Sequence, residues 1–187
     1  GELVIISFYE SKGINKIDIA LITHPDLDHI GGYMSILKEL EVVEFWDSKN
    51  YTTVAYKTIL NLIKKNNVKY FIGYKMLSER AEELSNKSFF GEGVRIKIFG
   101  PLVEYLENDN NSNSICLKIT YKNISFFFGG DTTKEAQQDM ALTWKDELKA
   151  TVLMVPHHGS EHNYNTTFLS YVSPDIAVAS VGINNKY

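Results

Sequence analysis

Three apolar segments of this chain each end abruptly at polar side chains, and this pattern constrains the fold more than any other feature. The pairs are "IDIALIT" (17–23) followed by "HPDLDH" (24–29), "ISFFFGG" (124–130) followed by Asp131, and "TVLMVP" (151–156) followed by His157 and His158. Each segment has the length and composition of a buried strand. Polar side chains at the ends of buried strands are well placed to converge on one cleft.

The remaining pattern predicts an α/β fold. Further strands are expected at 42–46, 69–73, 94–99, 115–121 and 175–181, and helices at 31–40, 52–67, 132–142 and 165–174. Thr132 is the expected N-cap of the third of these helices, with Glu135 three residues later. Strands and helices alternate early, whereas strands follow one another in the middle of the chain. This order favours a layered α/β domain with a mixed sheet or two sheets.

The segment "HPDLDHIGG" (24–32) is the first candidate metal site. Its two histidines and two aspartates are all metal-capable, and alternation in an extended loop lets His24, Asp26 and Asp28 point together. His29 is expected where the next helix begins, after which Gly31 and Gly32 allow a sharp turn and close backbone approach. A lone aspartate here would be a turn or capping residue. Four ligand-type side chains in six positions instead indicate a metal site, and such a loop can divide its ligands between two adjacent ions.

The other two strand ends carry further candidates. By itself Asp131 is explained by the dipole of the helix that follows, but a carboxylate directly after "FFFGG" is typical of an active site. "HHGS" by itself reads as a turn, and a pair of adjacent histidines after an apolar strand favours a ligand role. We expect His162 to be a surface residue or a group that supports the ligands, and not a ligand itself.

Composition sets further limits. The chain has 187 residues with 44% hydrophobic and 22% charged side chains, which is ordinary for a globular protein and argues against disorder. Its net charge of −4 and its lack of a basic stripe do not indicate a polyanion partner. Cys116 is the only cysteine, which excludes an intrachain disulfide, and its strand-like surroundings predict a buried, inert thiol. No apolar run approaches the ~20 residues of a membrane span, and no signal peptide is evident, so the cytoplasm is favoured without being identified.

At this point the sequence resembles the metallo-β-lactamase superfamily, and within it the hydrolase domain of ComEC-type DNA-uptake proteins. "LITHPDLDHIGG" resembles the His-x-His-x-Asp-His signature with Asp in place of the second His. "SFFFGGDTTKEAQQ", "VLMVPHHGS" and "SPDIAVASVGINNKY" resemble the bridging-carboxylate, distal-histidine and C-terminal segments. The match covers nearly the whole chain. Stand-alone hydrolases also carry this pattern.

The resemblance implies a four-layer αββα sandwich with two divalent metal ions, zinc or manganese, at one edge of its sheets. It assigns His24 and Asp26 to the first ion, Asp28 and His29 to the second, and Asp131 to both. One histidine of the adjacent pair completes the second site, for which His157 is preferred. Asp28 would also orient the attacking water, and His158 or Ser160 would meet a substrate oxygen.

Three departures from the family pattern are visible. Asn113 or Ser114 stands where many members have a further histidine ligand, and Asp26 replaces a histidine. Both changes move the site toward harder ions such as Mn²⁺, although Zn²⁺ still fits. The family's opening strands would precede Gly1, and a histidine would follow Tyr187. The chain therefore reads as one domain, residues 1–187, clipped at both ends.

These observations predict a metal-dependent hydrolase that uses metal-activated water on phosphodiesters, with DNA included. Other superfamily chemistry, on a lactone, a β-lactam or a phosphocholine ester, is the alternative enzyme class. A metal-binding module without turnover is the alternative outside enzymes. The sequence does not specify the natural substrate or the oligomeric state.

Overall fold

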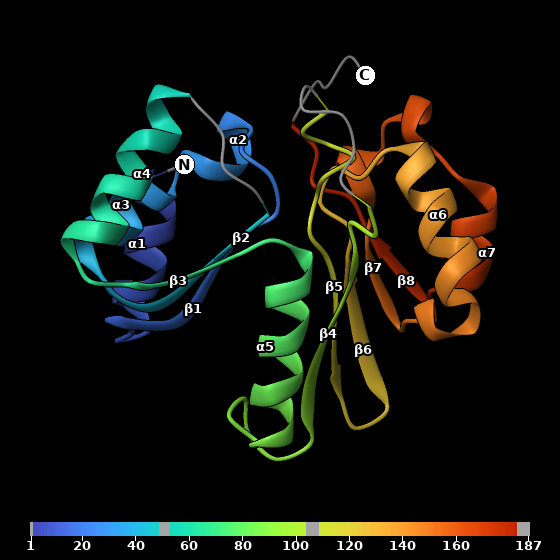
Figure 1. The fold of residues 1–187 in the computed structure, drawn as a ribbon, viewed down its shortest axis with the longest axis horizontal. Helices are drawn as coiled ribbons and strands as arrows, with labels where there is room; N and C mark the ends of the chain where they lie inside the picture. The colour runs from blue at the N-terminus through green and yellow to red at the C-terminus, as the bar shows by residue number, and fades with distance from the viewer. Residues whose placement is uncertain (1, 49–52, 104–108, 183–187) are drawn as a thin grey trace. The chain divides into compact units, whose positions relative to one another are not determined.

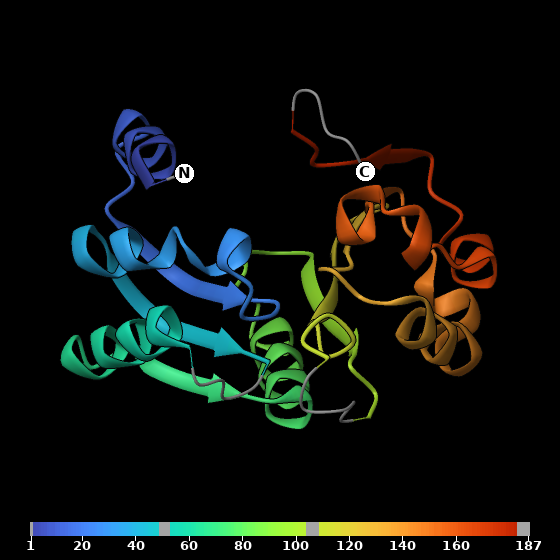
Figure 2. The same cartoon turned by 90° about the horizontal axis from the view of Figure 1, so that it is seen from above.

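The structure is a computed structural model, and it describes residues 2–48, 53–103 and 109–182. The chain divides into two compact units, residues 1–73 and 74–187. Each unit contains one sheet (Figures 1 and 2). The expectation of a single domain over 1–187 stays a prediction, as does the clipping of its ends. Among the residues just given, no helix is both long enough and apolar enough to cross a membrane.

The first unit is built on a three-stranded parallel sheet in the order β1-β2-β3. Its elements in chain order are α1 (Glu2–Ser11), β1 (Lys16–Ile22), α2 (Leu27–Ile30), α3 (Tyr33–Glu39), β2 (Glu41–Asp47), α4 (Val54–Lys65) and β3 (Lys69–Ile72). The core joins one face of the sheet, at Ala20, Ile22 and Phe45, to the apolar stripes of α3 and α4. Parallel pairing places the carboxyl ends of β1 and β2 at the same edge, where Ile22 lies opposite Asp47.

The second unit is built on a five-stranded mixed sheet in the order β4-β5-β6-β7-β8. Its elements are α5 (Tyr74–Asn86), β4 (Val94–Gly100), β5 (Cys116–Tyr121), β6 (Ile124–Phe128), α6 (Lys134–Trp144), η1 (Lys145–Leu148), β7 (Val152–Met154), η2 (Pro156–Gly159), η3 (Glu161–Asn163), α7 (Thr166–Val172) and β8 (Ile176–Val178). The pairs β4–β5 and β5–β6 are antiparallel, whereas β6–β7 and β7–β8 are parallel. The helices α6 and α7 cover one face (Figure 1).

Both faces of the five-stranded sheet are apolar. Phe127 and Leu153 point into the core with Met140 of α6 and Phe168 of α7. The alternate positions of the strands carry a second apolar set on the opposite face: Ile96, Ile119, Phe126, Phe128, Met154 and Val178. A sheet with two apolar faces is what an inner layer of a sandwich requires. Cys116 lies in β5 and is buried, which confirms the predicted inert thiol, and burial raises its pKa to about 12.

Among the described residues, the sequence predicted all eight strands and four of the helices, whereas two other helices and one N-cap differ from the prediction. The helices α1 and α5 were not predicted. The N-cap of α6 is Thr133, whose hydroxyl accepts from the Ala136 N–H, and not Thr132 as expected. The expected loop at 107–114 and the C-terminal segment after residue 182 lie partly outside the described residues.

The helix α5 runs along the outer edge of β4 (Figure 1). Its buried residues Leu77, Ala81 and Leu84 recur at helical spacing. At the same helix, the Ser85 hydroxyl accepts a hydrogen bond from the Ile96 N–H at 3.0 Å and donates to the Ile96 carbonyl at 3.4 Å. One side chain thus occupies backbone groups that an unprotected edge strand would expose.

This edge contact predicts that Ser85→Ala lowers the free energy of unfolding by about 1–3 kcal/mol, because two half-buried backbone groups lose their partner. Urea unfolding followed by circular dichroism measures the change. Ser170→Ala is the matched control, since that exposed hydroxyl bonds only to Thr167 of its own helix. Equal stability of Ser85→Ala and the parent protein would show that the edge does not depend on this side chain.

Candidate metal centre

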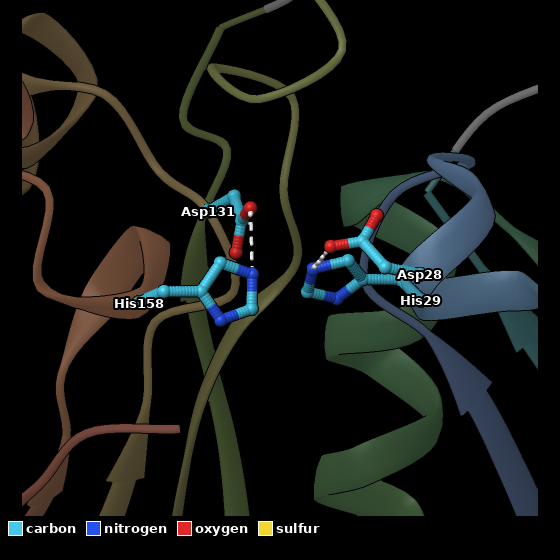
Figure 3. Close-up of side chains that lie close together, drawn as sticks. All are labelled: Asp28, His29, Asp131 and His158. Carbon is cyan, nitrogen blue, oxygen red and sulfur yellow. Dashed lines mark ion pairs between the residues drawn. The ribbon is translucent and has the colours of Figure 1, made fainter. Parts of the chain in front are cut away.

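The first half-site lies at the carboxyl end of β1. His24 is fully buried, and its Nε2 lies 3.8 Å from Asp26 Oδ2. The Nε2 of His29 lies 3.6 Å from Asp28 Oδ2 (Figure 3). The two imidazole rings face one another with centroids 4.0 Å apart. The segment 24–29 therefore brings two imidazoles and two carboxylates together within the first unit.

The local fold of this segment differs from the expected extended loop. The helix α2 begins at Leu27, so Asp28 and His29 both belong to the helix, and the expected helix start at His29 is wrong. Asp26 occupies the N-cap position, but its side chain makes no capping hydrogen bond. The Asp26 side chain therefore does not play the capping role that a lone aspartate would have at this position.

The glycine pair serves close approach and not a special turn conformation. Gly31 and Gly32 both have right-handed helical backbone angles. A Cβ at Gly32 would lie 3.0 Å from the Ile5 side chain of α1. The small residue lets α1 pack against the segment that follows the half-site.

Asp47 is a polar strand end that the sequence analysis did not single out. It is buried at the carboxyl end of β2, and its carboxylate accepts hydrogen bonds from the Tyr56 and Tyr70 hydroxyls, the latter at 2.7 Å. Burial, followed by the Asp47 charge, raises the pKa of both tyrosines. The two hydroxyls thus remain protonated donors that fix Asp47. "VVEFWDS" carries the same signal as the other strand ends, an apolar strand running into a carboxylate.

The second half-site lies where β6 and β7 end side by side. These strands are parallel, with Phe128 opposite Met154, so Asp131 and the histidine turn follow at the same edge. Asp131 is buried, and its Oδ2 lies 3.6 Å from His158 Nε2 (Figure 3). The Asp131 N–H donates to the Ser114 hydroxyl at 3.1 Å.

Two glycines let the histidine turn approach Asp131. A Cβ at Gly129 would lie 2.7 Å from Pro156 Cγ, so this proline packs directly on the glycine backbone. Gly130 has a positive φ of 54°, and its carbonyl accepts from the His157 N–H at 3.0 Å. The segments "GGD" and "PHHG" therefore pack directly on one another and are joined by a backbone hydrogen bond.

The histidine turn has a strained backbone. His157 and His158 are consecutive non-glycine residues with φ of 50° and 55°. Each such residue costs about 1–3 kcal/mol and persists only where its surroundings enforce it. Asn163 supplies part of that enforcement, because its Nδ2 lies 2.6 Å from His157 Nδ1. The sequence analysis did not name Asn163.

The side-chain contacts distinguish the two histidines. His158 Nδ1 lies 2.9 Å from the Ser180 carbonyl. A carbonyl can only accept, so Nδ1 carries the proton, and in the neutral ring Nε2 presents its lone pair. The other ring nitrogen, Nε2, is the one that lies 3.6 Å from Asp131 Oδ2. His157 Nδ1 is instead engaged by Asn163. The exposed side chain of His162 agrees with its predicted surface position.

The donor atoms of both half-sites fit a divalent cation. Asp28 with His29, and Asp131 with His158, each offer ligand atoms close enough to share an ion. Separations of 3.6–3.8 Å exceed a charge-assisted hydrogen bond. Two donors each about 2.1 Å from one ion lie roughly 3–4 Å apart, depending on the angle between them.

The chain belongs to the metallo-β-lactamase superfamily, because the model of that family matches residues 2–183. Members of this superfamily typically bind divalent metal ions and are usually hydrolytic. The predicted fold class is therefore confirmed. A solved structure of the β-hydroxylase CmlA has the same fold, with a TM-score of 0.51 and 14% identity over 87% of this chain and 36% of that one.

Named relatives also confirm the predicted resemblance to ComEC-type proteins. ComE operon protein 3 of Bacillus subtilis is 29% identical and matches 100% of this chain. Competence protein ComA of Neisseria gonorrhoeae is 24% identical over 98%, and recombination protein 2 of Haemophilus influenzae is 28% identical over 100%. The chain spans only 23%, 23% and 20% of the lengths of these three relatives.

The hydrogen bond between Ser114 and Asp131 generates a test of the second half-site. Ser114→Ala removes the acceptor for a buried N–H, so we expect a loss of about 1–3 kcal/mol in the free energy of unfolding. We also expect Mn²⁺ affinity to fall about tenfold, the lower end of the range for groups that orient metal ligands. Calorimetric titration of the folded variant measures the affinity.

Ser112→Ala is the matched control from the same loop. Within the described part of the chain, the Ser112 hydroxyl bonds to Asp109 and Thr133 and not to Asp131. The Ser112→Ala variant should therefore destabilise the fold without a comparable loss of Mn²⁺ affinity. If the two variants lose the same affinity, Ser114 contributes to the loop alone and not to the placement of Asp131.

Proposed function

We propose that this chain is a dinuclear metal-dependent hydrolase of phosphodiesters, with nucleic acid as the substrate class. The observation that carries the proposal is the donor geometry of the two half-sites, above all that of His158, whose Nε2 lies 3.6 Å from Asp131 Oδ2 while its Nδ1 bonds to the Ser180 carbonyl. An imidazole that a backbone carbonyl orients beside a buried carboxylate is an arrangement that metal sites commonly use.

In this proposal the residues of both half-sites hold two divalent ions, zinc or manganese. His24 and Asp26 would hold one ion, Asp28 and His29 would hold the other, and Asp131 would serve both. The contacts within the second unit favour His158 over His157 as the remaining ligand, because His158 Nε2 lies 3.6 Å from Asp131 Oδ2. His157 then supports the strained turn. When bound, the ions would supply an activated water and offset the negative charge of the phosphate.

Individual side chains around the two ions have separate roles in this proposal. Asp28 is the more exposed carboxylate of its half-site, at 65% against 42% for Asp26, and it orients the attacking water as well as binding metal. Asp131 is nearly buried, and it neutralises charge between the two ions. Ser160, two residues after His158, would meet a substrate oxygen. No protein nucleophile is required.

The substrate class is supported by the relatives and by ligand chemistry. Two relatives are named for competence and recombination, and those names belong to proteins several times longer than this chain. Three carboxylates among the donors favour hard ions that suit phosphate. The net charge of −4 works against a general attraction to polyanions, so recognition falls to the metal centre and its immediate surroundings.

The proposal predicts that Asp131→Ala stays folded but loses at least about a hundredfold in hydrolysis of bis-p-nitrophenyl phosphate with Mn²⁺ present. Removing the bridge leaves the repulsion of two cations uncompensated, and that loss matches one major electrostatic element of an active site. Excess Mn²⁺ should not restore the rate. Asp146→Ala, which removes an exposed carboxylate of the same unit, is the control.

Nitrocefin in place of the phosphodiester separates this proposal from β-lactam hydrolysis, since the wild-type chain should not turn it over. Near-normal phosphodiesterase turnover by a folded Asp131→Ala protein would rule out the dinuclear mechanism. Metal binding by the wild type without turnover of any ester would instead identify a binding module.

A further inference from the structure

A pocket of about 310 Å³ lies beside the histidine turn of the second unit. Val155, Pro156 and Leu169 supply apolar surface, and Ser160, Glu161 and Tyr164 supply the polar or aromatic remainder. Val155 and Pro156 directly precede His157. Ser160 follows His158 by two residues. The pocket is therefore built from the segment that carries the second half-site.

Tyr164 is the aromatic member of this pocket. Its side chain is 55% exposed, although a tyrosine ring is large and mostly apolar. It follows η3 in an extended conformation, with φ of −89° and ψ of 124°. An exposed ring beside an apolar wall is a surface on which a flat ligand group can stack.

The wall of the pocket is fixed to the half-site by hydrogen bonds. The Gln137 side-chain amide donates to the carbonyls of Thr132 and Asn163, each at 2.8 Å. Asn163 in turn contacts His157 Nδ1. These bonds connect α6, η3 and the histidine turn, so the pocket is preformed and its position relative to His158 is set.

We propose that this pocket receives a nucleobase of the substrate, adjoining the phosphate that is hydrolysed. The inference rests on the proposed function and names the subsite that goes with it. A volume near the lower limit of ligand pockets suits one base and not a whole nucleotide. The Tyr164 ring stacks on the base, and the Ser160 hydroxyl and Glu161 carboxylate line its polar edge. Stacking tolerates any base, so the subsite selects nucleotides over simple esters without selecting sequence.

The first test compares two esters with the same leaving group, thymidine 5′-p-nitrophenyl phosphate and methyl p-nitrophenyl phosphate. The wild-type chain with Mn²⁺ should prefer the nucleoside ester in kcat/KM. Tyr164→Leu should reduce that preference about tenfold, the scale of losing one base–aromatic stack, whereas Tyr164→Phe should retain it. Tyr121→Leu, at a similarly exposed tyrosine of β5, is the control and should leave the preference intact.

A second readout needs neither metal nor turnover. Saturation-transfer NMR with thymidine and the metal-free chain should show transfer to the base protons, and Tyr164→Leu should abolish it. An unaltered preference and unaltered transfer in Tyr164→Leu would overturn the subsite while the phosphodiesterase proposal stands. Failure of the metal-loaded wild type to hydrolyse either ester would remove the proposed function, and the subsite with it.

Discussion

The parallel pairing of β6 and β7 is the constraint on which the second half-site depends. It brings two segments 26 residues apart in sequence to one sheet edge, as the pairing of Phe128 with Met154 shows. Gly129 then lets Pro156 pack on the backbone, and the Gly130 carbonyl anchors His157. Without these two contacts the left-handed conformation of the adjacent histidines would depend on Asn163 alone, and His158 would lose its position beside Asp131.

The first half-site also depends on two parallel strands that end at the same edge of a sheet. The parallel strands β1 and β2 end together, and the short helix α2 turns the chain so that His29 returns against His24. The buried Asp47 is the last residue of the neighbouring strand β2, and two tyrosine hydroxyls hold its carboxylate in place. In both units the functional side chains stand after a buried strand, where rigid backbone positions them and a connecting loop exposes them.

The sequence was sufficient for the strands and the ligand-type residues because both are local signals. Apolar runs bounded by glycine and polar clusters identified β1, β6 and β7. The helix α5 could also have been predicted, since Leu77, Ala81 and Leu84 recur at helical spacing. The start of α2 was misplaced because Asp26 was treated as a ligand in an extended loop, although an aspartate after a proline is also a typical N-cap.

Other features depend on contacts that no local pattern encodes. Which of two adjacent histidines faces Asp131 is decided by left-handed backbone angles, which non-glycine residues rarely adopt. Those angles depend on the Asn163 side chain and on the Gly130 carbonyl. The first is a contact of one particular side chain, and the second is a backbone group from a distant part of the sequence. The bond from Ser114 to the Asp131 N–H and the protection of β4 by Ser85 likewise appear only once the strands are paired.

The proposed function requires that residues of both units hold one pair of metal ions. Electron paramagnetic resonance of the intact chain with two equivalents of Mn²⁺ tests it most directly, because two ions that share a bridging carboxylate are magnetically coupled. The account predicts a coupled spectrum in the wild type that is lost in both His29→Ala and His158→Ala. A spectrum of isolated ions in the wild type, or coupling that survives either substitution, would contradict it.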